Sequence, residues 1–227
     1  MGNKKQANQF LDFLTQSFPA DKDYVICTDD LEKLNSFFID MIYHRTVATH
    51  KKEIWGTKSR MITAYGQSIG WVPDRFDVIF FADSAIGEIA ESLVNRQNRL
   101  KVCDQHVVEA ISFMESLKIG HLRNVNPLFL SEGETKLLWF LSQYVKSPKF
   151  LIIPKLTAGL SKMRAINLIE FILHTQRLRH DLKKDSPVYI IGLSTSEHDY
   201  ADYFKQSDRW QLVQDINFIY NYRDIDE

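Results

Sequence analysis

The sequence has little cysteine and no long apolar run, and both absences exclude classes of protein. Its only cysteines, Cys27 and Cys103, lie far apart in the 227-residue chain. A disulfide framework needs several cysteines at short spacings, so we expect two reduced, buried thiols in a cytoplasmic protein. No apolar stretch approaches the roughly 18 residues that cross a bilayer, so any membrane association is expected to go through a partner.

Charge of one sign is lacking as well. A formal net charge of −1 gives no electrostatic reason to expect nucleic acid as a partner, because nucleic-acid-binding proteins usually carry a basic excess. The first residues have no apolar stretch behind them, and Gln6 stands where a myristoylation motif has Ser or Thr, so we expect no signal peptide and no lipid anchor. A local basic cluster is predicted to be the solvated end of a helix and contains Arg177, Arg179, His180, Lys183 and Lys184.

Motifs for metal binding and for nucleophilic hydrolysis are also missing. The histidines form no pair at the short spacing that a metal site on one helical face needs. The segment 192–196 lacks the closing glycine of a nucleophile elbow. We therefore predict no metal site and no hydrolase chemistry of that type.

Strand-like and helix-like patterns alternate along the chain without repeats or low-complexity linkers, which predicts one continuous domain over residues 1–227. Apolar, β-branched runs such as 151–153 are typical of strands buried on both faces. Strands are predicted at 24–27, 53–56, 61–72, 150–153, 187–193 and within 210–222. Helices are predicted at 8–18, from 31 onward, and at 84–95, 105–117, 135–145 and 162–178. This order predicts an α/β fold with a mainly parallel sheet.

The helix that begins near residue 31 follows a group of acidic residues. Asp29 and Glu32 stand at the spacing of a capping box, in which side chains accept the first N–H groups of a helix. Strand, short turn and helix in this order is the arrangement in which P-loop proteins hold phosphate. The predicted apolar face of the helix consists of Leu31, Leu34, Phe38, Met41 and Ile42.

Residues 130–161 carry the most specific pattern. Ser131 and Glu134 fit a second capping box, ahead of an apolar helical run. Gly133 is unfavourable in a first helical turn by roughly 1 kcal/mol, unless another group must approach the backbone closely. Pro154 and Lys155 follow the strand 150–153; proline offers no ligand for Mg²⁺, and a lysine cation cannot take a proton from water.

In their order and spacing these segments resemble the nucleotide-binding domain of ATP-binding-cassette (ABC) proteins. Residues 130–134 resemble the signature motif, and 149–161 resemble the Walker B strand and the D-loop, with Ser161 in place of the D-loop aspartate. Asp74 stands where the Q-loop has glutamine, and His198 is similar to the switch histidine.

The resemblance extends from about Tyr24 to about Gln214 and implies a fold class. The family has a P-loop NTPase-like (RecA-like), mainly parallel sheet with helices on both faces and a small helical subdomain. In this chain the subdomain would be an insertion at about residues 76–128.

The Walker A position departs most from the family. In a working P-loop, glycines let backbone N–H groups wrap the phosphates, a lysine reaches the terminal phosphates, and a Ser or Thr hydroxyl binds Mg²⁺. No glycine lies between Ile26 and Phe37. Leu34 takes the place of the lysine, and the degenerate motif is marked by Asp29, Asp30, Lys33 and Ser36.

The acidic residues at this position also oppose phosphate binding. A helix N-terminus attracts anions, but here the chain places its own carboxylates there. Each would repel a triphosphate by an amount of order 1 kcal/mol when exposed. We therefore expect no ATP binding at this position and no catalysis by the chain, which would be a pseudo-ATPase.

The resemblance implies a subunit of a transporter complex that is itself catalytically inactive. In the family two nucleotide-binding domains face each other, and the signature of one closes over the ATP held by the other. Ser131, Gly133 and Glu134 would then lie at an active ABC ATPase subunit, with ATP and Mg²⁺ at the shared interface, and the helical subdomain would dock a transmembrane permease. The chain would be cytoplasmic and peripheral to the inner membrane through this complex.

Two alternatives stay open from the sequence. One is a scaffold or regulatory interaction protein with an ABC-like shape and no role in transport; the other is a divergent ATPase whose site lies elsewhere. Ser131 and Gly133 favour the transporter subunit, because a scaffold has no use for a signature helix.

Overall fold

In the computed structural model the described residues are 12–18, 22–39, 69–73, 80–96, 101–182, 189–196, 210–214 and 216. The chain divides into two compact units. Unit 1 consists of Met1–Thr57, Ile152–Leu156 and Tyr189–Glu227, and unit 2 consists of Lys58–Leu151 and Thr157–Val188. The helical insertion at about residues 76–128 stays a prediction.

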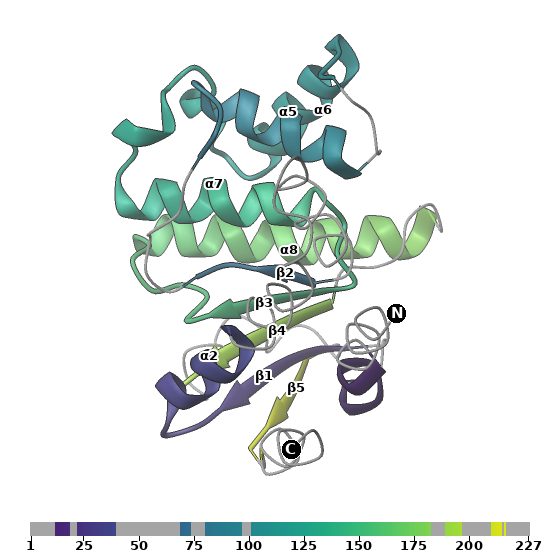
Figure 1. Ribbon diagram of the computed structural model, residues 1–227, viewed down its shortest axis with the longest axis vertical. Helices are drawn as coiled ribbons and strands as arrows, with labels where there is room; N and C mark the ends of the chain where they lie inside the picture. Colours follow the sequence, from purple (N-terminus) through teal and green to yellow (C-terminus); the bar gives the residue numbers. More distant parts are fainter. Residues whose placement is uncertain are drawn as a thin grey trace, which may run out of the picture. The chain divides into compact units, whose positions relative to one another are not determined.

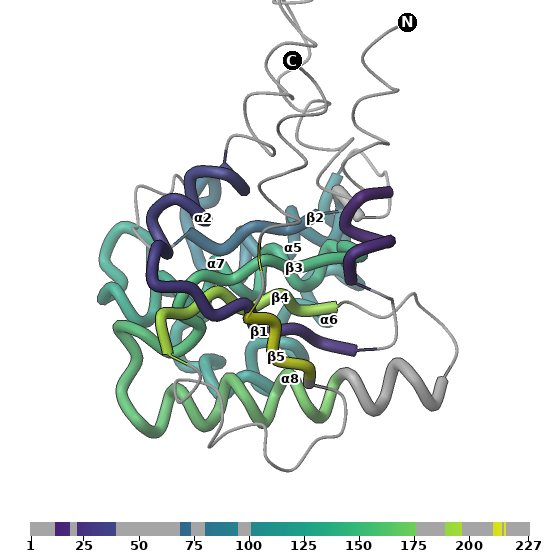
Figure 2. Tube along the Cα trace, turned by 90° about the horizontal axis from the view of Figure 1, so that it is seen from below, coloured from purple at the N-terminus to yellow at the C-terminus, as the bar shows by residue number. Residues whose placement is uncertain are grey.

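Unit 1 is built on parallel strands. Strand β1 (Asp23–Cys27) pairs in parallel with β4 (Tyr189–Ser194) and with β5 (Trp210–Val213), and it lies between them (Figures 1 and 2). Every residue of β4 is buried, as expected of a strand covered on both faces. Strand β3 (Phe150–Pro154) completes the order β2-β3-β4-β1-β5, so the predicted parallel sheet is confirmed.

Helix α2 (Leu31–Ile39) follows β1 and contributes to the core of unit 1. Its buried side chains include Leu31, Leu34 and Phe38, which confirms that part of the predicted apolar face. Met41 and Ile42 lie outside the described residues. A helical turn at residues 12–17 precedes β1, and the ring of Phe18 after it meets that of Tyr24 edge-on, with centroids 5.1 Å apart.

Unit 2 is mainly helical. Strand β2 (Ile69–Trp71) neighbours the first residues of β3, and α5 (Ala85–Arg96) packs against both α6 (Asp104–Ser116) and α7 (Glu132–Tyr144). Helix α8 (Lys162–Leu182) completes the unit (Figure 1). Two short 3₁₀ helices, η2 (Gly120–Leu122) and η3 (Pro127–Phe129), lead into α7.

The core of unit 2 joins α7 to α8 and to β2. The rings of Phe140, Tyr144 and Phe171 form a cluster, with centroids 5.2 Å apart for Tyr144 and Phe171. The indole N–H of Trp139 donates to the carbonyl of Trp71 at 2.9 Å. These contacts hold α7 against α8 and against β2.

Candidate functional site

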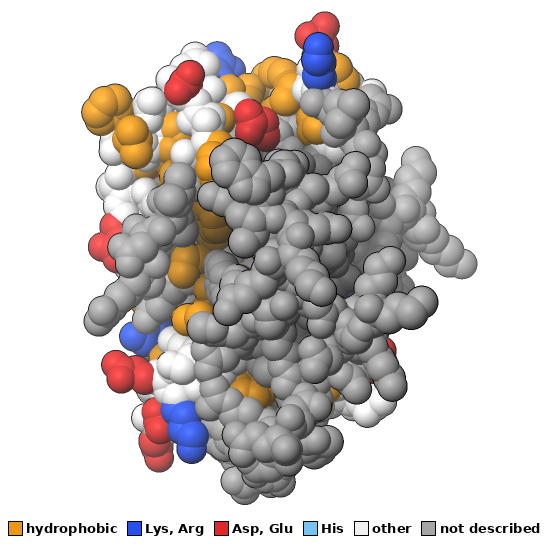
Figure 3. All heavy atoms as spheres, viewed as in Figure 1, with side chains coloured by type: hydrophobic (Ala, Val, Ile, Leu, Met, Phe, Trp, Pro, Cys, Tyr) orange, Lys and Arg blue, Asp and Glu red, His pale blue; other side chains and the backbone are white. Residues whose placement is uncertain are grey.

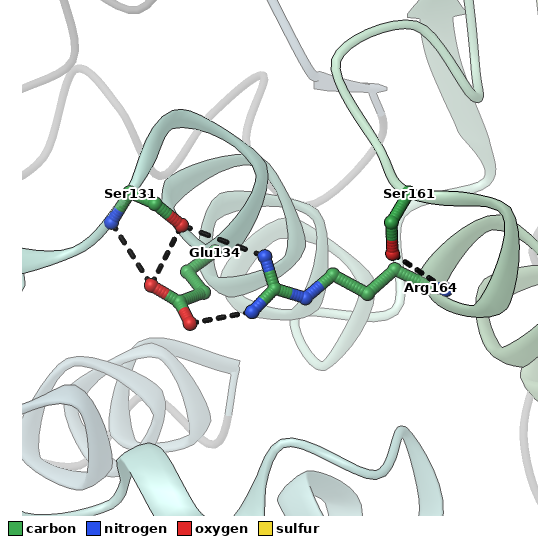
Figure 4. A network of polar contacts seen from close by, with 4 residues as sticks. All are labelled: Ser131, Glu134, Ser161 and Arg164. Carbon is green, nitrogen blue, oxygen red and sulfur yellow. Dashed lines mark hydrogen bonds and ion pairs between the residues drawn. The ribbon is translucent and has the colours of Figure 1, made fainter.

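Four polar residues meet where α7 and α8 begin, and we call them the signature cluster: Ser131, Glu134, Ser161 and Arg164 (Figure 4). The carboxylate of Glu134 lies between Ser131 and Arg164. Its Oε2 accepts the Ser131 N–H at 2.9 Å and the Ser131 hydroxyl at 2.7 Å, so the predicted capping box is confirmed. Its Oε1 accepts a bond from Nη2 of Arg164 at 2.5 Å.

Further bonds hold the arginine in this place. Nη1 of Arg164 donates to the Ser131 hydroxyl oxygen at 3.5 Å, and the Arg164 backbone N–H donates to Oγ of Ser161 at 3.4 Å. Ser161 therefore caps the start of α8, while the arginine side chain crosses to α7. The cluster ties the signature-like segment to the D-loop-like segment of the same unit.

The charges of the cluster compensate each other. Hydrogen bonds from the hydroxyl and the N–H of Ser131, together with the nearby guanidinium of Arg164, hold the pKa of Glu134 below its ordinary value. The side chains of Arg164 and Glu134 are 34% and 18% exposed, so the ion pair is only partly screened by water. At neutral pH the N-terminus of α7 thus carries an ionised, internally paired carboxylate.

Gly133 is buried against another part of its own unit. A Cβ atom on Gly133 would lie 2.9 Å from the carbonyl oxygen of Gly159, a backbone atom that cannot easily move. Gly159 itself has φ +76°, a conformation that favours glycine. The close approach predicted at Gly133 is therefore made by the 157–160 turn.

Lys136 also binds the 157–160 turn, and no pattern in the sequence predicts this role. Its side chain is only 2% exposed, and its Nζ donates to the carbonyl of Ala158 at 2.9 Å. A lysine one turn beyond a helix cap is normally predicted to be solvated. Gly133 and Lys136 together fix the backbone that follows the Walker B-like strand.

The phosphate-loop position in unit 1 is a turn of three residues, Thr28, Asp29 and Asp30, between β1 and α2. The Thr28 N–H donates to the carbonyl of Ser194 at 3.0 Å, and the Asp30 N–H donates to the Thr28 hydroxyl oxygen at 3.2 Å. The turn is therefore closed by bonds of the chain itself.

Asp30 caps α2, so the predicted cap at Asp29 is wrong by one residue. Oδ1 of Asp30 accepts the Lys33 N–H at 3.0 Å. The reason is the bond to Thr28, which turns the chain early enough for the helix to begin at Leu31. Ser36 lies one turn further along α2 and, like Asp29, Asp30 and Lys33, is exposed.

The Walker B-like strand β3 ends in residues with unusual backbone properties. Pro154 is its last residue and is buried, and it has no N–H to donate to a neighbouring strand. Lys155 is half-buried and has φ 44°, uncommon for a residue other than glycine. Its N–H donates to the carbonyl of Leu193 at 2.8 Å. The backbone here is held in place although the acidic side chains are absent.

Some predicted positions are not tested, and one thiol differs from its prediction. Asp74, His198 and the side chains of the basic cluster lie outside the described residues. Cys27 is half-buried, but Cys103 is exposed, so its predicted burial is wrong. It stands at the N-cap of α6, where its backbone N–H donates to Nδ1 of His106 at 3.1 Å.

Unit 2 also presents apolar side chains ahead of α7. Leu128 and Phe129 are 83% and 82% exposed, and Figure 3 shows apolar side chains at the surface in the upper part of the view. The turn that carries them is held by a bond of 2.9 Å from the Leu128 N–H to Asn126 and by the buried ring of Pro127. A partner covering these side chains would gain free energy from their burial.

Within the part of the chain that is described, no helix combines the length and the apolar character needed to cross a membrane. Among the same residues, no three His, Cys, Asp or Glu side chains come together as metal ligands would.

The parallel sheet with its helices matches the fold of solved ABC nucleotide-binding domains. The structure of CbiO1 from Clostridium perfringens, described as part of the ABC transporter complex CbiONQ, is 18% identical, with a TM-score of 0.57 over 86% of this chain and 74% of CbiO1. The dimeric ATP-binding cassette MJ0796 bound to ADP and phosphate is 12% identical, with a TM-score of 0.58 over 86% of this chain and 82% of the cassette. At these identities the likeness shows the fold.

A relative in sequence is MG303 of Mycoplasma genitalium, by its name an ABC transporter ATP-binding protein. It is 31% identical over 113 residues, which is 48% of this chain. The match spans 30% of the length of MG303, so it does not extend to that whole protein. No family model matches the chain.

Proposed function

We propose that this chain is a catalytically inactive ABC-type subunit that pairs with an active ABC ATPase in a transporter complex. The ABC fold and the similarity to MG303 support the family assignment. The single observation that carries the inactivity is the three-residue turn between Cys27 and Leu31.

This turn lacks both the length and the chemistry for binding ATP. A phosphate loop of the Walker A type places about eight residues, including its glycines and lysine, at this point. The turn has three residues, and Asp30 accepts a helix N–H group that a phosphate would otherwise receive. At the end of β3, Pro154 and the following Lys155 supply neither a Mg²⁺ ligand nor a general base.

The active partner would supply what this chain lacks. ATP and Mg²⁺ would be held by the Walker motifs of that ATPase, and the signature cluster of this chain would face them. A transmembrane permease would dock on the helical part of unit 2, which places the chain peripherally at the cytoplasmic side of the inner membrane. The name of CbiO1 as part of a transporter complex supports this assignment by analogy.

The test uses a candidate partner, an ABC ATPase with intact Walker motifs, which is to be sought among the genes next to the one that encodes this chain. Both chains are expressed together, and binding of a fluorescent ATP analogue and hydrolysis are measured for each chain and for the complex. We expect co-purification, no saturation of this chain alone at micromolar analogue, and loss of all hydrolysis when the partner's Walker B glutamate is replaced. Micromolar saturation of this chain alone would contradict the proposal and favour a divergent ATPase.

A scaffold or regulatory protein without a role in transport is a second candidate, and one observation favours it. Gly133 is explained by its contact with Gly159, so a glycine at this position needs no nucleotide. Replacing Ser131 with Phe distinguishes the candidates, because a bulky residue at a working signature should lower the ATPase rate of the complex. An unchanged rate would favour the scaffold.

A further inference from the structure

Two polar groups that a signature would offer to a phosphate, both of them on Ser131, are already occupied in this chain. Both the N–H and the hydroxyl of Ser131 donate to Oε2 of Glu134, at 2.9 and 2.7 Å. A serine hydroxyl has one proton, so it cannot donate to Glu134 and to a phosphate oxygen together. The glutamate and a phosphate from outside therefore exclude each other at Ser131.

Arg164 strengthens the contact between Glu134 and Ser131. The guanidinium holds the other carboxylate oxygen, Oε1, and also contacts the hydroxyl of Ser131 (Figure 4). Bonds between charged groups are roughly twice as strong as neutral ones. Arg164 lies in the first turn of α8, so displacing Glu134 breaks a bond between α7 and α8 as well as the two bonds from Ser131.

We propose that Glu134, held by Arg164, is an autoinhibitory contact that keeps the signature segment closed on its own chain. The inference rests on the proposed function, because it concerns the site that would face the partner's ATP. The carboxylate takes the place of the phosphate group until closure of the complex displaces it. This contact sets part of the ATP concentration at which the two subunits close.

The first test is the assembled complex with Glu134→Gln. Glutamine keeps the size of the side chain but removes the charge, so the contact weakens and ATP should compete more easily. We expect the ATP concentration for half-maximal hydrolysis to fall by about five- to tenfold. The matched control is Glu170→Gln, which removes the carboxylate of an exposed ion pair with Lys118 in the same unit. This control should change the ATP concentration for half-maximal hydrolysis by less than twofold. No fall, or a rise, in the Glu134→Gln complex would overturn the inference.

A second measurement needs no variant and covers a Glu134→Gln chain that does not fold. Hydrogen exchange of the Ser131 amide is followed in the wild-type complex as ATP is added. Protection without ATP and a change in the exchange rate as ATP saturates the partner would support displacement of Glu134. An exchange rate indifferent to ATP would contradict it.

The two proposals fail in different ways. If the chains do not co-purify, or hydrolysis is the same without this chain, then the proposed function is wrong. If the complex forms and hydrolyses ATP, but neither Glu134→Gln nor the Ser131 amide responds, then only the autoinhibitory contact is wrong.

Discussion

At the scale of single residues, Gly133 shows how a correct physical expectation can have an unexpected cause. The sequence indicated that some group must approach its backbone, and the resemblance implied a nucleotide. The structure supplies the carbonyl of Gly159 instead, 2.9 Å from where a Cβ would stand. No local pattern could identify that neighbour, because the two glycines lie on different segments of the chain.

Replacing Gly133 with Ala should destabilise the protein, although alanine is the better helix former. The clash with a backbone oxygen should cost up to about 3 kcal/mol, which outweighs the roughly 1 kcal/mol gained in helix propensity. Urea unfolding of both proteins measures the difference. Gly87→Ala in α5 is the control, since its Cβ would meet only the side chains of Ala82 and Ser84, and it should cost less. A stabilised Gly133→Ala protein would mean that the 157–160 turn yields.

The ion pair of Glu134 predicts a pH dependence of stability. Its pKa in the folded state lies below the ordinary value near 4.5, so the folded protein binds this proton less readily than the unfolded chain. The stability that it contributes is therefore present above that value and is lost as the pH falls through the lower, folded pKa.

Glu134→Gln should accordingly cost of order 1 kcal/mol of unfolding free energy at pH 7 and less at pH 3, because the pair is partly exposed. Urea unfolding at the two pH values measures this. Equal losses of unfolding free energy at pH 7 and pH 3 would show that the substitution acts through packing and not through the charge of Glu134. Glu170→Gln should have little effect at either pH.

At the scale of elements, the start of α7 followed from its cap and not from apolar periodicity, whereas the predicted cap of α2 was wrong by one residue. Helix α7 begins at Glu132 rather than at 135, because the bonds between Ser131 and Glu134 add a polar first turn that has no apolar residue to mark it. The buried lysine Lys136 was missed for a related reason: its partner is the carbonyl of Ala158, which is distant in sequence. Among the described residues, most strand and helix positions could be predicted, whereas contacts between segments could not; the strands predicted at 53–56 and at 61–68 lie outside those residues.

The start of α2 gives a matched pair of acidic residues for a test. Asp30 accepts the Lys33 N–H, so Asp30→Ala should cost about 1 kcal/mol of stability. Asp29→Ala removes a neighbouring charge without removing this cap and should be nearly neutral. Urea unfolding compares the variants with the wild type, and a larger loss at Asp29 would restore the cap that the sequence predicted.

At the scale of the whole molecule, the fold was predictable and the activity is a separate question. Alternating patterns and buried, β-branched strands sufficed for an α/β protein with a parallel sheet, since these follow from burial on both faces. Site chemistry depends on a few side chains and on loop length, both of which can change while the core is kept. The short turn at 28–30 illustrates this, because the strand and helix on either side of it remain.

It follows that acidic residues placed at the end of β3, at positions 154 and 155, should not restore hydrolysis. Pro154→Asp with Lys155→Glu would return a Mg²⁺ ligand and a general base, but the turn at 28–30 would still lack the N–H groups and the lysine that hold the phosphates. We expect no Mg²⁺-dependent release of phosphate above background from the purified chain with either Lys155→Glu or both changes. Circular dichroism establishes that the variants are folded, and the partner ATPase serves as the positive control. Measurable turnover by a folded variant would mean that the chain binds ATP through residues other than those at the Walker A position, and the assignment as an inactive subunit would have to be abandoned.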